Sequence, residues 1–206
     1  MLLYGYHSKK GMNDVVRSLM WIAGAAGAAV LYGAYVYNGL VRRSENVTNG
    51  WSQIDVQLKR RHDLIPNLVE TVRGYADHER DLFERIAALR SEAMKSASPA
   101  ESGETEARLS GALKTLFAVS EGYPELKANS NFLALQEELA STENKIAFAR
   151  QYYNDSVKEY NIAVSSFPDS IVAGMMGYRR RSMWSIDVPD ERNAASVSFP
   201  GDSAGT

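Results

Sequence analysis

The chain has 206 residues, of which 45% are hydrophobic and 23% are charged, a balance typical of a folded domain rather than of a disordered chain. Its 23 lysines and arginines are nearly balanced by 25 aspartates and glutamates, so the net charge of -2 provides no bulk attraction to nucleic acid. The absence of cysteine excludes disulfides, thiol catalysis, iron–sulfur clusters and cysteine-based zinc sites.

A charge-free segment from Leu19 to Tyr37 is long enough to cross a membrane. As a helix it would span about 28 Å, close to the thickness of the hydrocarbon core of a bilayer. Trp21 lies near one end and tyrosines lie near the other, where aromatic rings favour the membrane interface. A cleaved signal peptide is the alternative, but the segment continues into a helical pattern without turn residues. We therefore expect a transmembrane helix over residues 19–37, after an N-terminal extension over residues 1–18.

The orientation of this helix depends on where translation starts. The nearest basic residues are Lys9, Lys10 and Arg17 before the segment and Arg42 and Arg43 after it. This count slightly favours an N-terminus inside the cell. If translation begins at Met12 rather than Met1, only Arg17 remains on the first side and the rule places the rest of the chain in the cytoplasm. We adopt the second interpretation and expect a single-pass protein of the cell membrane with a cytoplasmic bundle.

After the membrane segment, apolar residues recur at alternating steps of three and four from Tyr37 to Ala93. The polar members of this heptad stripe are Ser44, Arg61 and Glu79. So regular a stripe indicates a helix rather than a strand or a loop. The pattern predicts a single helix to about Met94, kinked but not broken at Pro66.

Further helices are predicted after a cluster of helix-breaking residues at Ser96–Gly103. We expect them at about 105–120, at Asn131–Ser165 with Asn131 as N-cap, and as a short segment at 171–176. Because short connections make neighbouring helices antiparallel, we predict an all-α fold. Its up-and-down bundle of three long helices plus a short fourth would cover residues 38–178, and a flexible tail would cover residues 179–206.

Polar residues at positions where a bundle needs apolar ones are the candidate functional residues. They are Arg61, Asn67, Glu70 and Glu79 on the first long helix and Glu143, Arg150, Asn154 and Asn161 on the third. Buried charges are costly unless paired, so these residues would form an interhelical network that fixes the register of the bundle. A polar groove that binds a peptide or a headgroup is the alternative. A hydrolase that uses Glu143, Arg150 and Asn154 is a further alternative.

The sequence contains no motif of a familiar catalytic or metal centre. It has no Gly-x-Ser-x-Gly, no glycine-rich phosphate loop, no His-Glu-x-x-His and no Glu-x-x-His pair. His62 and His78 would lie about 24 Å apart along one helix, too far to share an ion. We therefore predict no catalytic residue, no metal and no cofactor.

A basic and aromatic cluster begins the predicted tail. Its members are Arg179, Arg180, Arg181 and Trp184. Flexible segments of this composition bind anionic membranes or acidic partners. We expect the cluster to contact a membrane or a protein partner.

Two long stretches of the chain resemble the bacterial LemA family. They are YNGLVRRSENVTNGWSQIDVQLKRRHDLIPNLVETVRGYADHE at Tyr37–Glu79 and NFLALQEELASTENKIAFARQYYNDSVKEYNIAVSSFPDSIVAGMMGY at Asn131–Tyr178. The resemblance implies an N-terminal membrane anchor and an antiparallel helical bundle. It implies no established catalytic activity, so it transfers no catalytic residue.

The resemblance also implies an association with other membrane proteins, such as metalloproteases and TPM-domain proteins. We therefore expect a non-catalytic scaffold or adaptor for membrane or envelope proteins. A self-assembling membrane-remodelling protein, and hence a homo-oligomer, is the alternative. Nucleic acid is not expected as a partner.

Overall fold

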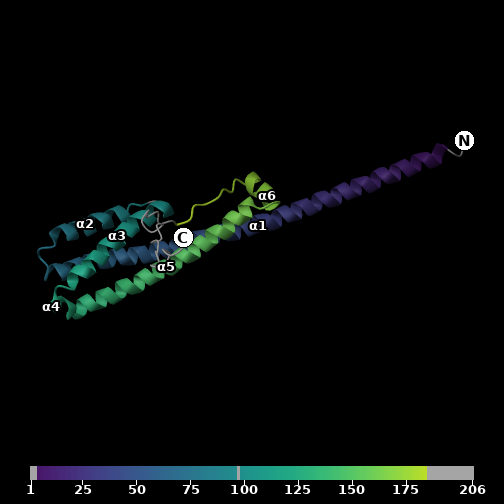
Figure 1. Ribbon diagram of the computed structural model, residues 1–206. Helices are drawn as coiled ribbons and strands as arrows, with labels where there is room; N and C mark the ends of the chain where they lie inside the picture. Colours follow the sequence, from purple (N-terminus) through teal and green to yellow (C-terminus); the bar gives the residue numbers. More distant parts are fainter. Residues whose placement is uncertain (1–3, 97, 185–206) are drawn as a thin grey trace, which may run out of the picture. The chain divides into compact units, whose positions relative to one another are not determined.

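The computed structural model describes residues 4–96 and 98–184, and these residues form six α-helices and no strand (Figure 1). The helices are α1 (Tyr4–Arg73), α2 (Arg80–Ala93), α3 (Pro99–Ser120), α4 (Pro124–Lys127), α5 (Ser130–Ser165) and α6 (Asp169–Met175). The predicted all-α class and helical bundle are therefore confirmed. Most of the predicted tail, residues 185–206, and the first three residues of the predicted extension lie outside the described residues.

The chain divides into two compact units. The first unit consists of residues 1–50 with 152–181, and the second of residues 51–151 with 182–206. Both long helices, α1 and α5, contribute to both units.

In the first unit, α1 contains one segment that is long and apolar enough to cross a membrane. Its large apolar side chains face outward, and Trp21 is 78% exposed. An apolar surface of this length that the protein does not cover is what a membrane span requires. By length and composition the segment qualifies as a span, as a signal sequence in this position also would.

The predicted single helix to Met94 is wrong, because α1 ends at Arg73 and α2 begins at Arg80. Gly74 directly follows α1, and glycine has the lowest helix propensity after proline. α1 does continue through Pro66 as expected. The chain therefore turns back after α1. In the second unit four helices, α1, α2, α3 and α5, run alternately up and down, whereas the sequence predicted three (Figure 1).

The starts of α3, α5 and α6 differ from the sequence prediction, and α6 begins at Asp169 rather than at 171. α3 begins at Pro99 rather than at about Thr105, because the Ser98 side chain accepts a hydrogen bond from the Glu101 N–H and Pro99 fits the first turn. The predicted cap of α5 is also corrected. The Oδ1 of Asn129, not the side chain of Asn131, accepts the N–H groups of Asn131 and Phe132, at 2.9 and 3.1 Å.

Each unit has its own hydrophobic core. In the second unit the core is built from α1, α2, α3, α4 and α5, and includes Ile65, Leu68, Val72, Phe83, Ile86, Leu109, Leu116, Leu126, Phe132 and Leu139. In the first unit it is built from Val36, Leu40, Ala163 and Ala173. Burial of each leucine or isoleucine contributes about 1.5–3 kcal/mol, so these cores stabilise both units.

Candidate functional site

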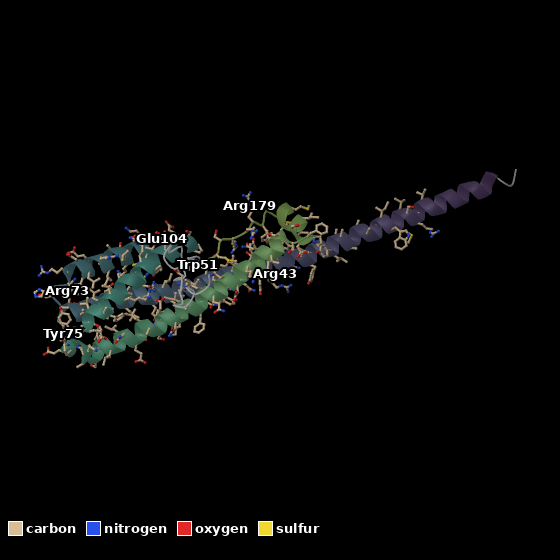
Figure 2. All side chains as sticks on the ribbon, in the orientation of Figure 1. Arg43, Trp51, Arg73, Tyr75, Glu104 and Arg179 are labelled. Carbon is tan, nitrogen blue, oxygen red and sulfur yellow. The ribbon has the colours of Figure 1, made fainter. Side chains whose placement is uncertain are left out.

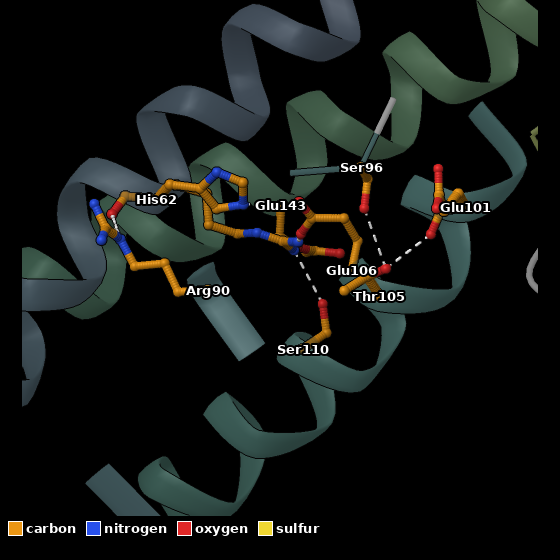
Figure 3. A network of polar contacts seen from close by, with 9 residues as sticks. His62, Arg90, Ser96, Glu101, Thr105, Glu106, Ser110 and Glu143 are labelled. Atoms are coloured by element: carbon orange, nitrogen blue, oxygen red, sulfur yellow. Dashed lines mark hydrogen bonds and ion pairs between the residues drawn. The ribbon is translucent and has the colours of Figure 1, made fainter. Parts of the chain in front are cut away.

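A buried charged network joins three helices of the second unit (Figure 3). The guanidinium of Arg61 on α1 forms an ion pair with Glu106 of α3 and a second one, at 2.7 Å, with Glu143 of α5. Its Nη1 also donates a hydrogen bond of 3.0 Å to the Ser110 hydroxyl. Arg61 is 2% exposed, so these contacts replace the water that would otherwise solvate its charge.

His62, which is also buried, extends the network to α2. Its Nε2 lies 2.7 Å from Oε1 of Glu106, and its backbone carbonyl accepts a hydrogen bond of 2.6 Å from Nε of Arg90 on α2. The carboxylate of Glu106 is thus shared between Arg61 and His62. All four long helical segments of the second unit are therefore tied to one cluster of polar groups.

The network fixes the protonation state of His62. Burial, followed by the positive charges of Arg61 and Arg90, lowers the pKa of the ring from 6.5 to about 4, against the opposing effect of Asp63 and Asp55. Glu106 would favour a charged ring, but the guanidinium of Arg61 already neutralises this carboxylate, so burial dominates. At neutral pH the ring is uncharged and donates its Nε2–H to Glu106, because a carboxylate only accepts.

Neighbouring charges shift the pKa of Arg61 in opposite directions. Burial lowers the pKa of Arg61, Glu143 raises it, and the positive charge of nearby Arg150 lowers it further. The side chain of Glu143 is 45% exposed, so this pair links the buried network to the surface. The guanidinium keeps its charge under all ordinary conditions.

A cavity of about 570 Å³ adjoins the network within the second unit. It is lined by Arg61, Glu106, Ala107, Ser110, Gly111, Leu113, Lys114, Phe117, Gln136, Leu139, Ala140, Glu143, Ile146, Arg150 and Trp184. Its volume lies within the range of about 300–1,000 Å³ that binding sites for small ligands occupy. Its lining combines charged and polar side chains with leucine, isoleucine and aromatic ones. Such a site suits a group that carries both an apolar part and a charge.

Three of the eight predicted polar residues meet at this place. Arg61, Glu143 and Arg150 all line the cavity. Asn67 and Glu70 are exposed instead, and Glu79 directly precedes α2 without a capping side-chain bond. The prediction of one network for all residues on the first long helix is therefore wrong. These positions belong to the exposed face of α1 and to the turn after it.

The two remaining predicted residues, Asn154 and Asn161, belong to the first unit. Asn161 is buried, and its amide pairs with the backbone of Arg181: Oδ1 accepts the Arg181 N–H and Nδ2 donates to the Arg181 carbonyl, both at 2.8 Å. The Tyr160 hydroxyl donates a bond of 3.0 Å to the Arg179 carbonyl. Residues 179–181 are thus fixed on α5, contrary to the predicted flexibility of the tail at this point.

The residues of the basic and aromatic cluster differ in their exposure to solvent. Arg179 and Arg180 are exposed, and their predicted contact with a membrane or a partner stays a prediction. Trp184 is 5% exposed and packs on Trp51 in the second unit, with ring centroids 5.8 Å apart. Trp51 is labelled in Figure 2. A surface contact through Trp184 is therefore wrong for the described structure, because its ring is already covered.

Sequence reasoning missed Glu106 and Ser110, and it did not include His62 among the residues of the polar network. The apolar face predicted for α3 starts at Leu109. Extending this face one turn toward the N-terminus leads to Glu106, which is buried with Thr105 and Ser102. The signal was present, because Glu106 lies within the helix predicted at about 105–120, one turn before Leu109. Among residues 15–96 and 98–184, no three His, Asp or Glu side chains are grouped so that they could hold a metal ion.

Known proteins are similar to this chain over most of its length. Magnetosome protein MamQ 2 of Paramagnetospirillum magneticum is 25% identical over an alignment of 170 residues that covers 70% of this chain and 62% of the relative. MamQ of Magnetospirillum gryphiswaldense is 24% identical with the same coverage. Protein LemA of Metamycoplasma hominis is 27% identical over an alignment of 150 residues that covers 70% of this chain and 67% of the relative. The chain thus spans less than two thirds of the length of the magnetosome relatives.

The model of the LemA family matches residues 50–199, which is well over half of the chain. This match includes the whole of α2, α3, α4, α5 and α6, and with them the charged network and the cavity. It agrees with the resemblance carried by the two quoted sequence stretches. The chain belongs to the LemA family.

Proposed function

We propose that this chain is a membrane-anchored, non-catalytic adaptor that binds an acidic, amphipathic segment of a partner membrane or envelope protein in the cavity of its second unit. The exposed apolar segment of α1 serves as the anchor. The second unit is cytoplasmic if translation starts at Met12, since Arg42 and Arg43 then outnumber Arg17.

The observation that carries the proposal is the position of Arg150. This half-buried cation lines the cavity close to the like charge of Arg61. Among the described residues, no carboxylate forms an ion pair with it. A partly desolvated charge of this kind is costly, so a carboxylate brought by a partner would gain both a counter-ion and a hydrogen-bond donor.

The rest of the cavity supports an amphipathic rather than a purely polar ligand. Leu113, Phe117, Leu139 and Ile146 provide apolar walls, and Lys114 adds a second cation. With Arg61, three cationic side chains line the cavity together with the two carboxylates of Glu106 and Glu143. An acidic side chain next to leucine-like or aromatic side chains fits this arrangement of charge and apolar surface.

The charged network itself favours a structural role. Glu106 is bonded to both Arg61 and His62, and Glu143 is paired with Arg61. A general base needs a carboxylate or imidazole that can reach a substrate proton. Here these groups neutralise one another, which supports a non-catalytic assignment over a hydrolase.

Photocrosslinking of the full-length protein in its own membranes tests the proposal. The photoreactive residue p-benzoylphenylalanine replaces Gln136, an exposed residue at the cavity, and in a matched control it replaces the exposed Lys127 of α4, which does not line the cavity. We expect a discrete crosslinked protein from position 136 only, and at least tenfold less of it when Arg150→Ala is added. Equal products from both positions, or a product that does not respond to Arg150→Ala, would contradict the proposal. A product that contains only a second copy of this chain would favour self-assembly and membrane remodelling instead.

A further inference from the structure

Helix α6 is fixed beside the end of the membrane segment of α1, within the first unit. The Tyr32 hydroxyl donates a hydrogen bond of 2.6 Å to Oδ1 of Asp169, the first residue of α6. Ala173 of α6 packs with Val36 and Leu40 of α1 in a small core. The rings of Tyr37 and Tyr178 approach to 6.4 Å between centroids. α6 therefore lies next to residues 32–40 of α1.

This position coincides with one boundary of the expected membrane span, residues 19–37. Tyr32 and Tyr37 are separated by about 7.5 Å along the helix axis. The headgroup region adds about 5–7 Å on each side of the hydrocarbon core. A helix held beside these tyrosines is thus at the depth of the membrane interface whenever α1 spans the bilayer.

The surface that α6 turns away from α1 is strongly apolar. Phe167, just before α6, is 82% exposed and Met175 is 80% exposed, and Ile171 and Met176 are exposed as well. Ile171 and Met175 are one turn apart and share a face of the helix. Large exposed apolar side chains gathered in and just before one short helix indicate a contact with a membrane or a protein.

The polar groups around the patch fit the interface. The carboxylate of Asp169 is already bonded to Tyr32. Exposed Arg43 on α1 and Arg179 after α6 are both marked in Figure 2, and Arg42 and Arg180 are exposed beside them in sequence. Arginines just beyond a membrane span are attracted to anionic headgroups. The bonds from Arg181 to Ser44 and Thr48 keep the segment after α6 close to the α1 residues that follow the span.

We propose that α6 and Phe167 insert into the membrane interface beside α1, with Phe167, Ile171, Met175 and Met176 in contact with lipid. This inference rests on the proposed anchoring by α1. α6 then forms a second, shallow contact with the bilayer that fixes the tilt and rotation of the first unit, which a single span leaves free.

Spin labels at single introduced cysteines test this directly, because the chain has no cysteine of its own. Full-length protein is reconstituted into vesicles of phosphatidylethanolamine and phosphatidylglycerol, with a nitroxide at Met175→Cys. Leu31→Cys, within the span, reports on the anchor, and Glu159→Cys, exposed on α5 of the same unit, reports on water. All three side chains are exposed, so none of the substitutions disturbs a core.

We expect the nitroxides at 31 and 175 to collide more with oxygen than with a water-soluble nickel chelate, and the nitroxide at 159 to show the reverse. If position 31 is in lipid but position 175 is in water, the inference is overturned and the anchor stands. If both positions are in water, the anchor itself fails and the inference falls with it. If position 175 is shielded from both reagents, a protein contact covers α6, and lipid insertion is excluded. A second label at Ile171→Cys must give the same result as the label at 175.

Discussion

Arg61 on α1 and Glu106 on α3 form an ion pair in which the two side chains are only 3% and 5% exposed. Neither charge can be solvated by water if the other is removed. We expect Arg61→Leu to lower the free energy of unfolding by about 3–5 kcal/mol, because it leaves the Glu106 carboxylate buried without its main counter-charge. The double variant Arg61→Leu/Glu106→Leu should lose less, since it leaves only His62 and the half-exposed Glu143 unpaired. Chemical unfolding of the full-length protein in detergent, followed by circular dichroism, measures both values.

A matched control comes from the neighbouring residue. Arg60 forms an ion pair with Glu138 in which the side chains are 49% and 36% exposed. Exposed pairs contribute about 0–1 kcal/mol, so Arg60→Leu should have a small effect. If the double variant at Arg61 and Glu106 were destabilised by the sum of its single variants, the two charges would not be coupled as the structure requires.

His62 should make the second unit sensitive to acid. Its pKa in the folded protein, about 4, is lower than the ordinary value of 6.5, so the unfolded chain binds a proton more readily between these pH values. The stabilisation from the neutral ring is therefore fully present above about pH 6.5 and is lost as the pH falls to about 4. The loss should be on the order of 2–3 kcal/mol for a shift of this size. Thermal unfolding between pH 7.5 and 4 checks this, and His62→Gln should flatten the profile in that window. An unchanged profile in His62→Gln would assign the acid sensitivity to other groups.

The heptad stripe was a reliable guide to burial but not to helix ends. Leu40, Val47, Ile54, Leu58, Ile65, Leu68 and Val72 are all buried as the stripe predicts. The alternating steps of three and four also continue through residues 74–79, where no helix is present. Periodicity records which residues face a core, and both α1 and α2 face the same one. It therefore cannot distinguish one long helix from two that fold back on each other. Gly74 was the local signal for the break.

The candidate site was predictable only in part, for a related reason. Arg61 and Glu143 stood out because they are polar at core positions of long helices. Their third partner, Glu106, lies in the first turn of the helix predicted at about 105–120, next to the cluster of helix-breaking residues at Ser96–Gly103, where no core position was expected. Which of the eight polar residues would meet depended on the turn at 74–79, because this turn brings α2 and α3 alongside α1. The topology of the bundle determines which distant residues pair. The spacing of residues along one helix cannot predict that topology.

Asn161 should hold residues 179–181 in place. Its amide donates to the Arg181 carbonyl and accepts from the Arg181 N–H. Asn161→Asp keeps the acceptor but loses the donor, and it sets a carboxylate against a carbonyl oxygen. We expect the Arg181 amide to exchange hydrogen at least tenfold faster, and trypsin to cleave after Arg179, Arg180 or Arg181 more readily. Asn144→Asp, at an exposed position of α5, is the control and should leave both rates unchanged. Equal rates in the two variants would show that other contacts hold the segment.

At Gly50, α1 packs closely against α5 in the first unit. A Cβ at this position would lie 3.1 Å from the Cα of Tyr153, a backbone atom that cannot move aside as a flexible side chain can. Gly50→Ala should therefore lower the free energy of unfolding by about 1–2 kcal/mol, because overpacking outweighs the gain in helix propensity. Gly111→Ala is the matched control, since this exposed position of α3 has no neighbouring atom within 4 Å of the added Cβ. It should stabilise the protein by about 0.5–1 kcal/mol through helix propensity alone. Thermal unfolding of the two variants measures the change in the free energy of unfolding. If the helices pack tightly at Gly50, Gly50→Ala destabilises the protein while Gly111→Ala stabilises it. If they do not, both variants are stabilised.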